Sequence, residues 1–435
     1  MSARLNVIAR APEFGDTVPA PLGMPSAPDV AWEPPIAGQR RSIHTWNEYM
    51  ALASRVVGRF HGHFRLRHFD YEHPARLQPG TPRRLKRPYV TPVAYTEWGA
   101  ADAPVLLCCG GVANVAMRFH YLASDLADRW RVVCMDWLGR GRSGWLAAEE
   151  DYSLATYSEQ LRQMITHLAE TDVTRAGGTG EAAGTGTGHA PAPHAAHAMT
   201  RRRTARAEAR RGVTIAGHGV TVLGSSMGGT AAIELIARHP GFIERLILND
   251  VGPHIPARRR RRRAEAIARH YVFRNPSDLL RRVGASNKND GPVSDDIRFN
   301  LSFHQTRWSE EESGRVYRHD VRAMQAYRRT SHTSVMQWPQ WTRVHCPVLL
   351  IHGMQSDALL MPTLERMRRG KAISVMHVPD TGHTPLLADR NQIDFIRQWL
   401  AGDVPAGSEW SVLHAPARDA YPGSPIPFAP ASALR

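Results

Sequence analysis

The sequence predicts an α/β protein with a mostly parallel central sheet, helices on both faces, and a helical cap inserted between two strands. Short apolar runs rich in β-branched residues alternate with segments whose apolar residues recur at helical spacing. Parallel strands need crossover connections, usually helices, so this alternation is typical of such a sheet. The chain has 435 residues, 42% of them hydrophobic, which suffices for one large domain with insertions.

The stretch 220–232 gives the strongest functional signal. Residues 220–223 are apolar and β-branched, which predicts a buried strand, and residues 227–238 have the apolar spacing of a helix. The turn between them contains the pattern Gly-x-Ser-x-Gly, and only Ser226 fits its frame. Between a strand and a helix this pattern forms a nucleophile elbow, which exposes the serine above the sheet. We therefore favour a nucleophilic Ser226 over a Gly/Ser-rich turn without chemistry.

The other elements follow in order along the chain. The remaining strands are expected over residues 90–98, 105–109, 131–136, 246–249, 348–352 and 374–378. Helices are expected over residues 46–60, 119–127 and 153–170, from a capping box at 309–312 to residue 327, and around 393–400.

Composition divides the chain into several regions. We expect a flexible leader (1–44), a core (45–252 and 343–401), a disordered low-complexity insertion within that core (171–217), a helical cap (253–342) and a loose tail (402–435). The insertion has almost no large apolar side chains in its central part and cannot build a core. Its histidines, His189, His194 and His197, are interpreted as solvated rather than metal-binding because nothing nearby fixes their geometry.

Two further residues complete a catalytic pattern with Ser226. Asp357 follows the strand predicted at 348–352, and His383 follows the last predicted strand. Parallel strands place their carboxyl ends at one edge of the sheet, where active sites form. A histidine can activate the serine hydroxyl, and a carboxylate holds the imidazole in the required tautomer. Asp250, also just past a strand, is the reserve candidate; we favour Asp357 because Val251-Gly252-Pro253 gives Asp250 a turn-forming role.

These motifs resemble the α/β-hydrolase superfamily, in particular its capped esterases, lactonases and C–C hydrolases. The resemblance covers about residues 90–401 apart from the insertion, and rests on the elbow, the loop 136–143, the Asp357 region and Gly382-His383-Thr384-Pro385. It implies an oxyanion hole made by the backbone N–H groups of Gly111 and Met227. The sequence departs from many members at Cys109, where they have histidine. Ser226 argues against the epoxide hydrolases and haloalkane dehalogenases, which have aspartate at the elbow.

The substrate pocket leaves a weaker signal in the sequence. Phe119 and Trp137 are candidates to line it, although packing in the core explains both residues equally well. We expect a serine hydrolase that cleaves a small carboxylic ester or lactone through an acyl-enzyme, without cofactor or metal. A C–C bond hydrolase or an acyltransferase with the same triad remains the alternative.

Charge and cysteine content limit the partners. The formal net charge is +15, and part of the excess lies in arginine tracts such as residues 258–263. A nucleic-acid or anion binder using these tracts is the alternative from another class, but it would leave the triad unexplained; we interpret 258–263 as a solvated cap surface. The four cysteines lie in or beside apolar runs without a CxxC pair, which favours reduced thiols. With no signal-peptide or membrane-spanning run, a cytoplasmic location is expected, without membrane or specific nucleic-acid partners.

Overall fold

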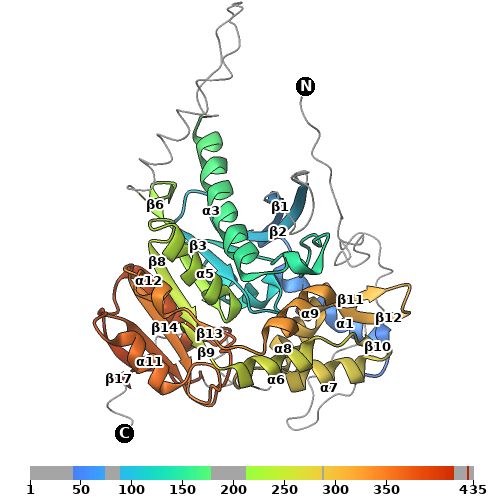
Figure 1. Ribbon diagram of the computed structural model, residues 1–435. Helices are drawn as coiled ribbons and strands as arrows, with labels where there is room; N and C mark the ends of the chain where they lie inside the picture. The colour runs from blue at the N-terminus through green and yellow to red at the C-terminus, as the bar shows by residue number, and fades with distance from the viewer. Residues whose placement is uncertain (1–42, 74–88, 178–211, 287–288, 416–428, 431–435) are drawn as a thin grey trace, which may run out of the picture.

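The computed structural model describes residues 43–73, 89–177, 212–286, 289–415 and 429–430. A ten-stranded sheet runs through this part of the chain, and its first two strands and its last strand are antiparallel to their neighbours (Figure 1). In spatial order the strands are β1 (Phe64–His73), β2 (Tyr89–Trp98), β4 (Arg131–Met135), β3 (Val105–Cys109), β7 (Thr221–Ser225), β8 (Arg245–Asn249), β14 (Val348–Gly353), β15 (Ser374–Val378), β16 (Glu409–Ser411) and β17 (Ala429–Pro430). The predicted α/β fold with a mostly parallel sheet is confirmed.

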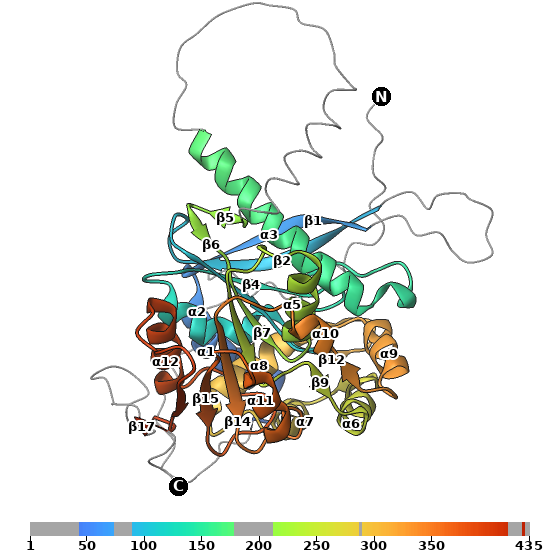
Figure 2. The same ribbon diagram turned by 60° about the vertical axis from the view of Figure 1, so that its left-hand side comes forward.

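Helices cover both faces of the sheet and bury a separate apolar layer on each. On one face lie α3 (Leu154–Gly177), α5 (Met227–Arg238) and α11 (Met361–Arg368); on the other lie α2 (His120–Leu126) and α12 (Arg390–Ala401) (Figure 2). Successive side chains of a strand point to opposite faces, so Leu107 of β3 joins the first layer while its neighbours Leu106 and Cys108 join the second. Strands buried on both faces explain the continuous apolar runs in the sequence.

The segment between β8 and β14, predicted to be a helical cap and called the cap below, contains short strands as well as helices. Its elements are β9 (His254–Ile255), α6 (Ala257–Ile267), β10 (Val272–Phe273), α7 (Pro276–Ser286), α8 (Asp295–Gln305), β11 (Thr306–Ser309), β12 (Gly314–Tyr317), α9 (Val321–Thr330), β13 (Val335–Met336) and α10 (Trp338–Trp341). The N-terminal helix α1 (Trp46–Val56) packs on this cap, since the Tyr49 ring lies 4.8 Å from that of Phe299 in a shared apolar cluster. The core predicted to start at residue 45 therefore begins with a helix that packs on the cap.

Both predicted ends of the insertion are wrong. Helix α3 continues to Gly177 and a short β5–β6 hairpin (Thr214–Ile215 and His218–Gly219) precedes β7, so the insertion predicted at 171–217 is too long at both ends. Its middle, 178–211 with the three histidines, lies outside the described residues, as do residues 1–42 of the leader. In the tail predicted to be loose, β16 pairs in parallel with β15 and extends the sheet.

The capping box at 309–312 misled the helix prediction. The Ser309 hydroxyl does accept the Glu312 N–H at 3.4 Å, but this turn closes the β11–β12 hairpin. The helix begins later, at Val321, where the Asp320 side chain caps it by accepting the Arg322 N–H. Strand β1 had no prediction, since its side chains are mostly polar or charged and alternate in burial along an edge of the sheet.

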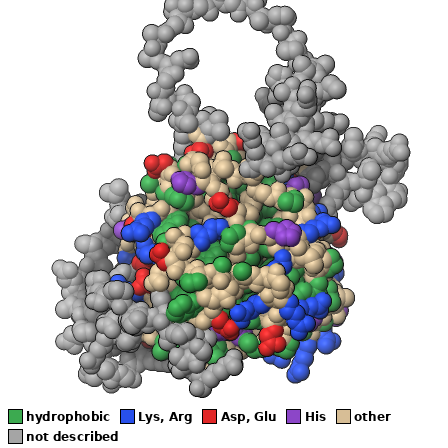
Figure 3. Space-filling model, turned by 90° about the vertical axis from the view of Figure 1, so that its left-hand side faces the viewer, with side chains coloured by type: hydrophobic (Ala, Val, Ile, Leu, Met, Phe, Trp, Pro, Cys, Tyr) green, Lys and Arg blue, Asp and Glu red, His purple; other side chains and the backbone are tan. Residues whose placement is uncertain are grey.

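The described helices include none that is long and apolar enough to cross a membrane. The face that carries α11 and α12 mixes side chains of every type over most of its area, and Lys and Arg side chains gather at its lower right (Figure 3). The positive charge is thus concentrated in places rather than spread evenly over this face.

Candidate active site

The turn between β7 and α5 places Ser226 at the carboxyl end of the sheet. Its backbone has φ 52° and ψ −114°, a strained conformation that non-glycine residues adopt rarely and mainly at functional sites. Glycine is required at 228, because a Cβ there would collide with the carbonyl oxygen of Cys109 on the neighbouring strand β3. Ser225 is fully buried and accepts a hydrogen bond from Asn249, so Ser226 alone can meet a ligand.

His383 bridges Ser226 and a carboxylate. Its Nε2 lies 2.9 Å from the Ser226 Oγ, and its Nδ1 lies 2.8 Å from an Asp250 oxygen. The loop after β15 that carries His383 is held by the core, since Asn249 Nδ2 donates to the Pro385 carbonyl at 2.9 Å. The imidazole is therefore held between a hydroxyl that it can deprotonate and a carboxylate that can stabilise the resulting cation.

Asp250 is buried and receives hydrogen bonds from several directions. Its side chain has no exposed surface, and one oxygen accepts the Gly353 N–H at 3.0 Å. The other oxygen accepts from the Ser356 hydroxyl at 2.5 Å as well as lying against His383. Asp250 adopts φ 52°, and the turn of the chain directs its carboxylate toward the histidine.

Asp357 does not reach His383, and its assignment as the acid is wrong. The carboxylate instead pairs with two arginines of the cap helix α6, at 2.5 Å from Arg259 Nε and 3.0 Å from Arg262 Nη1. Its side chain is 43% exposed, whereas that of Asp250 is fully buried. The physical reason is that Asp357 is the fourth residue after the end of β14, and the intervening turn leads toward the cap. Asp250 contacts His383 although the turn at Val251-Gly252-Pro253 follows it directly. That turn therefore does not prevent Asp250 from pairing with the histidine.

The two predicted oxyanion donors differ in availability. Within the described residues, no acceptor engages the N–H of Met227, at the first position of α5. The Gly111 N–H donates instead to the Asn114 side-chain oxygen at 2.9 Å. A Cβ at Gly111 would be 3.4 Å from that of Ser226, so this loop does border the nucleophile. The predicted second donor is present, but Asn114 occupies it.

Phe119 and Trp137 do not line the pocket, so both substrate-binding predictions are wrong. Trp137 has no exposed surface and donates its indole N–H to the Gly110 carbonyl at 2.8 Å, which supports the loop before Gly111. Phe119 is 1% exposed and packs in the apolar layer beneath α2. Burial raises the pKa of the Cys109 thiol, which therefore stays protonated and offers no competing nucleophile.

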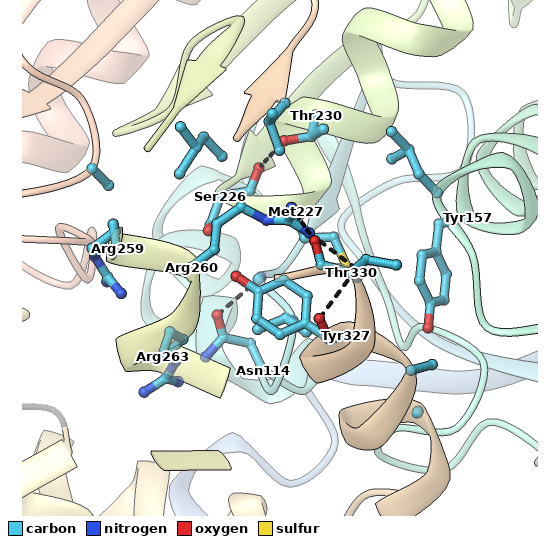
Figure 4. Close-up of a pocket in the computed structure, with 18 of the residues that line it drawn as sticks. Asn114, Tyr157, Ser226, Met227, Thr230, Arg259, Arg260, Arg263, Tyr327 and Thr330 are labelled. Carbon is cyan, nitrogen blue, oxygen red and sulfur yellow. Dashed lines mark hydrogen bonds between the residues drawn. The ribbon is translucent and has the colours of Figure 1, made fainter. Parts of the chain in front are cut away.

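A pocket of about 1350 Å³ opens over Ser226, between the strand ends and the cap. Ser226, Met227 and Thr230 come from the elbow and its helix, and Tyr327 and Thr330 come from cap helix α9 (Figure 4). Arginines of α6 form a further part of the lining. No group of three or more His, Cys, Asp or Glu side chains suited to a metal occurs among the described residues.

Comparison with known proteins shows the family of this chain. Residues 105–393 match the model of a family described as the alpha/beta hydrolase family. The chain belongs to the alpha/beta hydrolase family. Two solved structures share the fold: a putative hydrolase from Rickettsia typhi (TM-score 0.60, 19% identity, 78% of this chain and all of that one) and an alpha/beta hydrolase from Novosphingobium aromaticivorans (TM-score 0.54, 18% identity, 77% and 98%).

One relative of this alpha/beta hydrolase has a more specific name. The chain is 26% identical over 319 residues to a 3-hydroxybutyrate-oligomer hydrolase of Cupriavidus necator, which covers 71% of this chain and 93% of the relative. An alpha/beta hydrolase with relatives named as hydrolases is an enzyme of the hydrolase type, and its substrate is a small molecule.

Sequence reasoning missed two residues of this alpha/beta hydrolase site. The sequence favours Asp357 over Asp250, although the position of Asp250 directly after a strand is itself a signal for a site residue. Asn114 carried no signal, because its contact with Gly111 depends on how the loop after β3 folds back on itself.

Proposed function

We propose that the chain is a serine hydrolase in which Ser226, His383 and Asp250 act as a triad on small carboxylic esters. The observation that carries the proposal is the continuous path of hydrogen bonds from Ser226 through His383 to the buried Asp250, at 2.9 and 2.8 Å. A serine hydroxyl is a weak nucleophile at neutral pH and gains strength from such a base.

In this mechanism Ser226 Oγ attacks the ester carbonyl while His383 Nε2 takes its proton. The proton then passes to the leaving alcohol, and an acyl-enzyme remains on Ser226. Water then gives a proton to the same nitrogen as it attacks the acyl carbon, and that proton returns to Ser226 Oγ when the acid is released. Asp250 stabilises the imidazolium formed in each half of the reaction.

The negative oxygen of each tetrahedral intermediate needs preorganised N–H donors. The Met227 N–H is available for this role at the start of α5. The Gly111 N–H can join it once the substrate oxygen displaces the Asn114 side chain. In this proposal Asn114 holds the second donor in the absence of substrate.

The substrate class that fits best is a short linear ester of a hydroxy acid. A pocket of about 1350 Å³ is large enough for an acyl chain and its alcohol together. The relative named as a 3-hydroxybutyrate-oligomer hydrolase supports linear hydroxybutyrate oligomers as the first substrates to test. Fold similarity alone does not distinguish hydrolysis from acyl transfer, so the test must measure the product.

The test is hydrolysis of the linear 3-hydroxybutyrate trimer, with released monomer and dimer measured by chromatography. We expect turnover by the full chain and its loss in Ser226→Ala, together with loss of labelling by a fluorophosphonate probe. Ser225→Ala is the matched control, because it removes the neighbouring hydroxyl, which does not line the pocket. Persistent labelling in Ser226→Ala, or labelling mapped to Ser225, would refute the assigned nucleophile.

A further inference from the structure

The pocket over Ser226 is rich in arginines, and all the carboxylates in its lining already have arginine partners. The pairs are Glu149 and Glu150 with Arg329, Glu234 with Arg238, Asp290 with Arg118, and Asp357 with Arg259 and Arg262. Two more arginines of the lining, Arg140 and Arg260, donate to main-chain carbonyl oxygens, at 2.9 Å for Arg140 and 2.6 Å for Arg260. The acids of the lining are therefore already neutralised by their arginine partners. They offer no further negative charge to the other arginines of the pocket.

Arg263 and Arg282 stand apart from this pattern. Within the described residues, neither guanidinium makes a hydrogen bond or an ion pair, although both line the pocket. Arg282 lies over the Tyr271 ring, with its guanidinium carbon 3.7 Å from the ring centroid. The cap therefore offers two cations to the pocket without an anion to balance them.

These cations share one corner of the cavity. The rings of Tyr271 and Tyr317 lie 6.3 Å apart, and both line the pocket together with Arg263 and Arg282. Both arginines act on the Tyr317 hydroxyl: burial raises its pKa, and the two positive charges oppose that rise. Arg263 and Arg259 project from α6 one turn apart (Figure 4), whereas Arg261 is exposed and does not line the pocket.

We propose that Arg263 and Arg282 form a subsite that binds the free carboxylate of an ester substrate while Ser226 attacks its ester bond. A guanidinium is a planar donor that matches a carboxylate, and a cation in a partly dehydrated site gains from such a partner. The subsite rests on the proposed function and deepens it, since it selects esters that end in a carboxylate over neutral esters. Tyr271 and Tyr317 flank the bound chain with rings and hydroxyl groups.

The environment of Arg263 gives an independent reason for a missing anion. Burial lowers the pKa of its guanidinium, and the neighbouring cation Arg259 lowers it further. Asp290, a carboxylate whose charge opposes this lowering, is already paired with Arg118 at 3.0 Å. A ligand carboxylate would supply the charge that this corner of the protein lacks.

The experiment compares the linear hydroxybutyrate trimer, which has a free carboxylate, with its methyl ester, which has none. The measured quantity is the ratio of kcat/KM for the acid to kcat/KM for the methyl ester. We expect the full chain to prefer the acid, and Arg263→Gln and Arg282→Gln each to lower this ratio roughly tenfold to a hundredfold, as the loss of a charged hydrogen bond does. Arg263→Lys should retain part of the preference.

Arg261→Gln is the matched control, because it removes the same charge from the exposed face of the same helix. A ratio near one in the full chain, or an equal ratio in Arg263→Gln and Arg261→Gln, would overturn the subsite while leaving ester hydrolysis intact. If the unaltered chain turned over neither ester, the proposed function itself would be refuted.

A phosphate-bearing ester is the other source of an anion that two guanidinium groups can bind. Inhibition by acetate and by inorganic phosphate separates the two sources. Stronger inhibition by acetate that is lost in Arg263→Gln supports the carboxylate. Stronger inhibition by phosphate that is lost in this variant would overturn the carboxylate assignment.

Discussion

The loops after β8 and β14 differ sharply although the two strands are parallel neighbours in the sheet. Each loop carries an aspartate at the carboxyl edge, where the sequence favours catalytic residues. Asp250 directly follows β8 and is buried against His383, whereas Asp357 lies four residues beyond β14 with 43% of its side chain exposed. A position after a strand therefore brings a residue to the site, but the turn that follows decides where its side chain points.

The second loop nevertheless contributes to the site through other atoms. The Gly353 N–H and the Ser356 hydroxyl both donate to Asp250, at 3.0 and 2.5 Å. The loop after β14 thus holds the acid that the loop before the cap supplies. Its own acid, Asp357, binds Arg259 and Arg262 and links the core to the cap. One carboxylate thus contacts His383, whereas the other contacts arginines of the cap.

The largest effect is expected when each of the two carboxylates is exchanged for an amide. Asp250→Asn keeps the packing but removes the negative charge beside the histidine, so we expect kcat for an ester to fall by about three to four orders of magnitude. Asp357→Asn, measured on the same ester, should change kcat by less than about threefold because it has no contact with His383. A larger loss in Asp357→Asn than in Asp250→Asn would reverse the assignment.

A smaller effect should follow removal of the hydroxyl that orients Asp250. Ser356→Ala deletes one donor to the carboxylate but leaves the Gly353 N–H in place. A hydrogen bond to a charged group contributes about 1.5–3 kcal/mol, so we expect kcat to fall roughly tenfold or more. An unchanged kcat together with reduced thermal stability would instead indicate a merely structural role.

The smallest effect concerns the carboxylate of the cap. Asp357→Asn frees Arg259 and Arg262, both of which line the pocket, so KM for an anionic ester should fall about two- to threefold, as expected for exposed charges screened by water. The free energy of unfolding should change by less than about 1 kcal/mol because the pair is partly exposed. Titration at low and high salt checks the charge effect, which should disappear at high salt; a rise in KM would contradict it.

The sequence alone determined the architecture and singled out Ser226, the nucleophile that we propose. Buried strands on both faces leave apolar runs that local composition reveals, so β3, α5 and β15 have the predicted bounds. The elbow is also a local feature, because the glycines around Ser226 are required by contacts within one turn and its neighbouring strand. His383 was found for a similar reason, as its position after the last strand is encoded along the chain.

Only the tertiary structure decided which groups meet at the site. The choice of Asp250, the occupation of the Gly111 N–H by Asn114 and the absence of Trp137 from the pocket depend on loop directions. The unpaired charge of Arg263 likewise emerges only after the cap has folded, since its sequence neighbours are arginines that differ in exposure and partners. Periodicity reports which face of an element is buried, whereas pairing between loops depends on distances that no local pattern records.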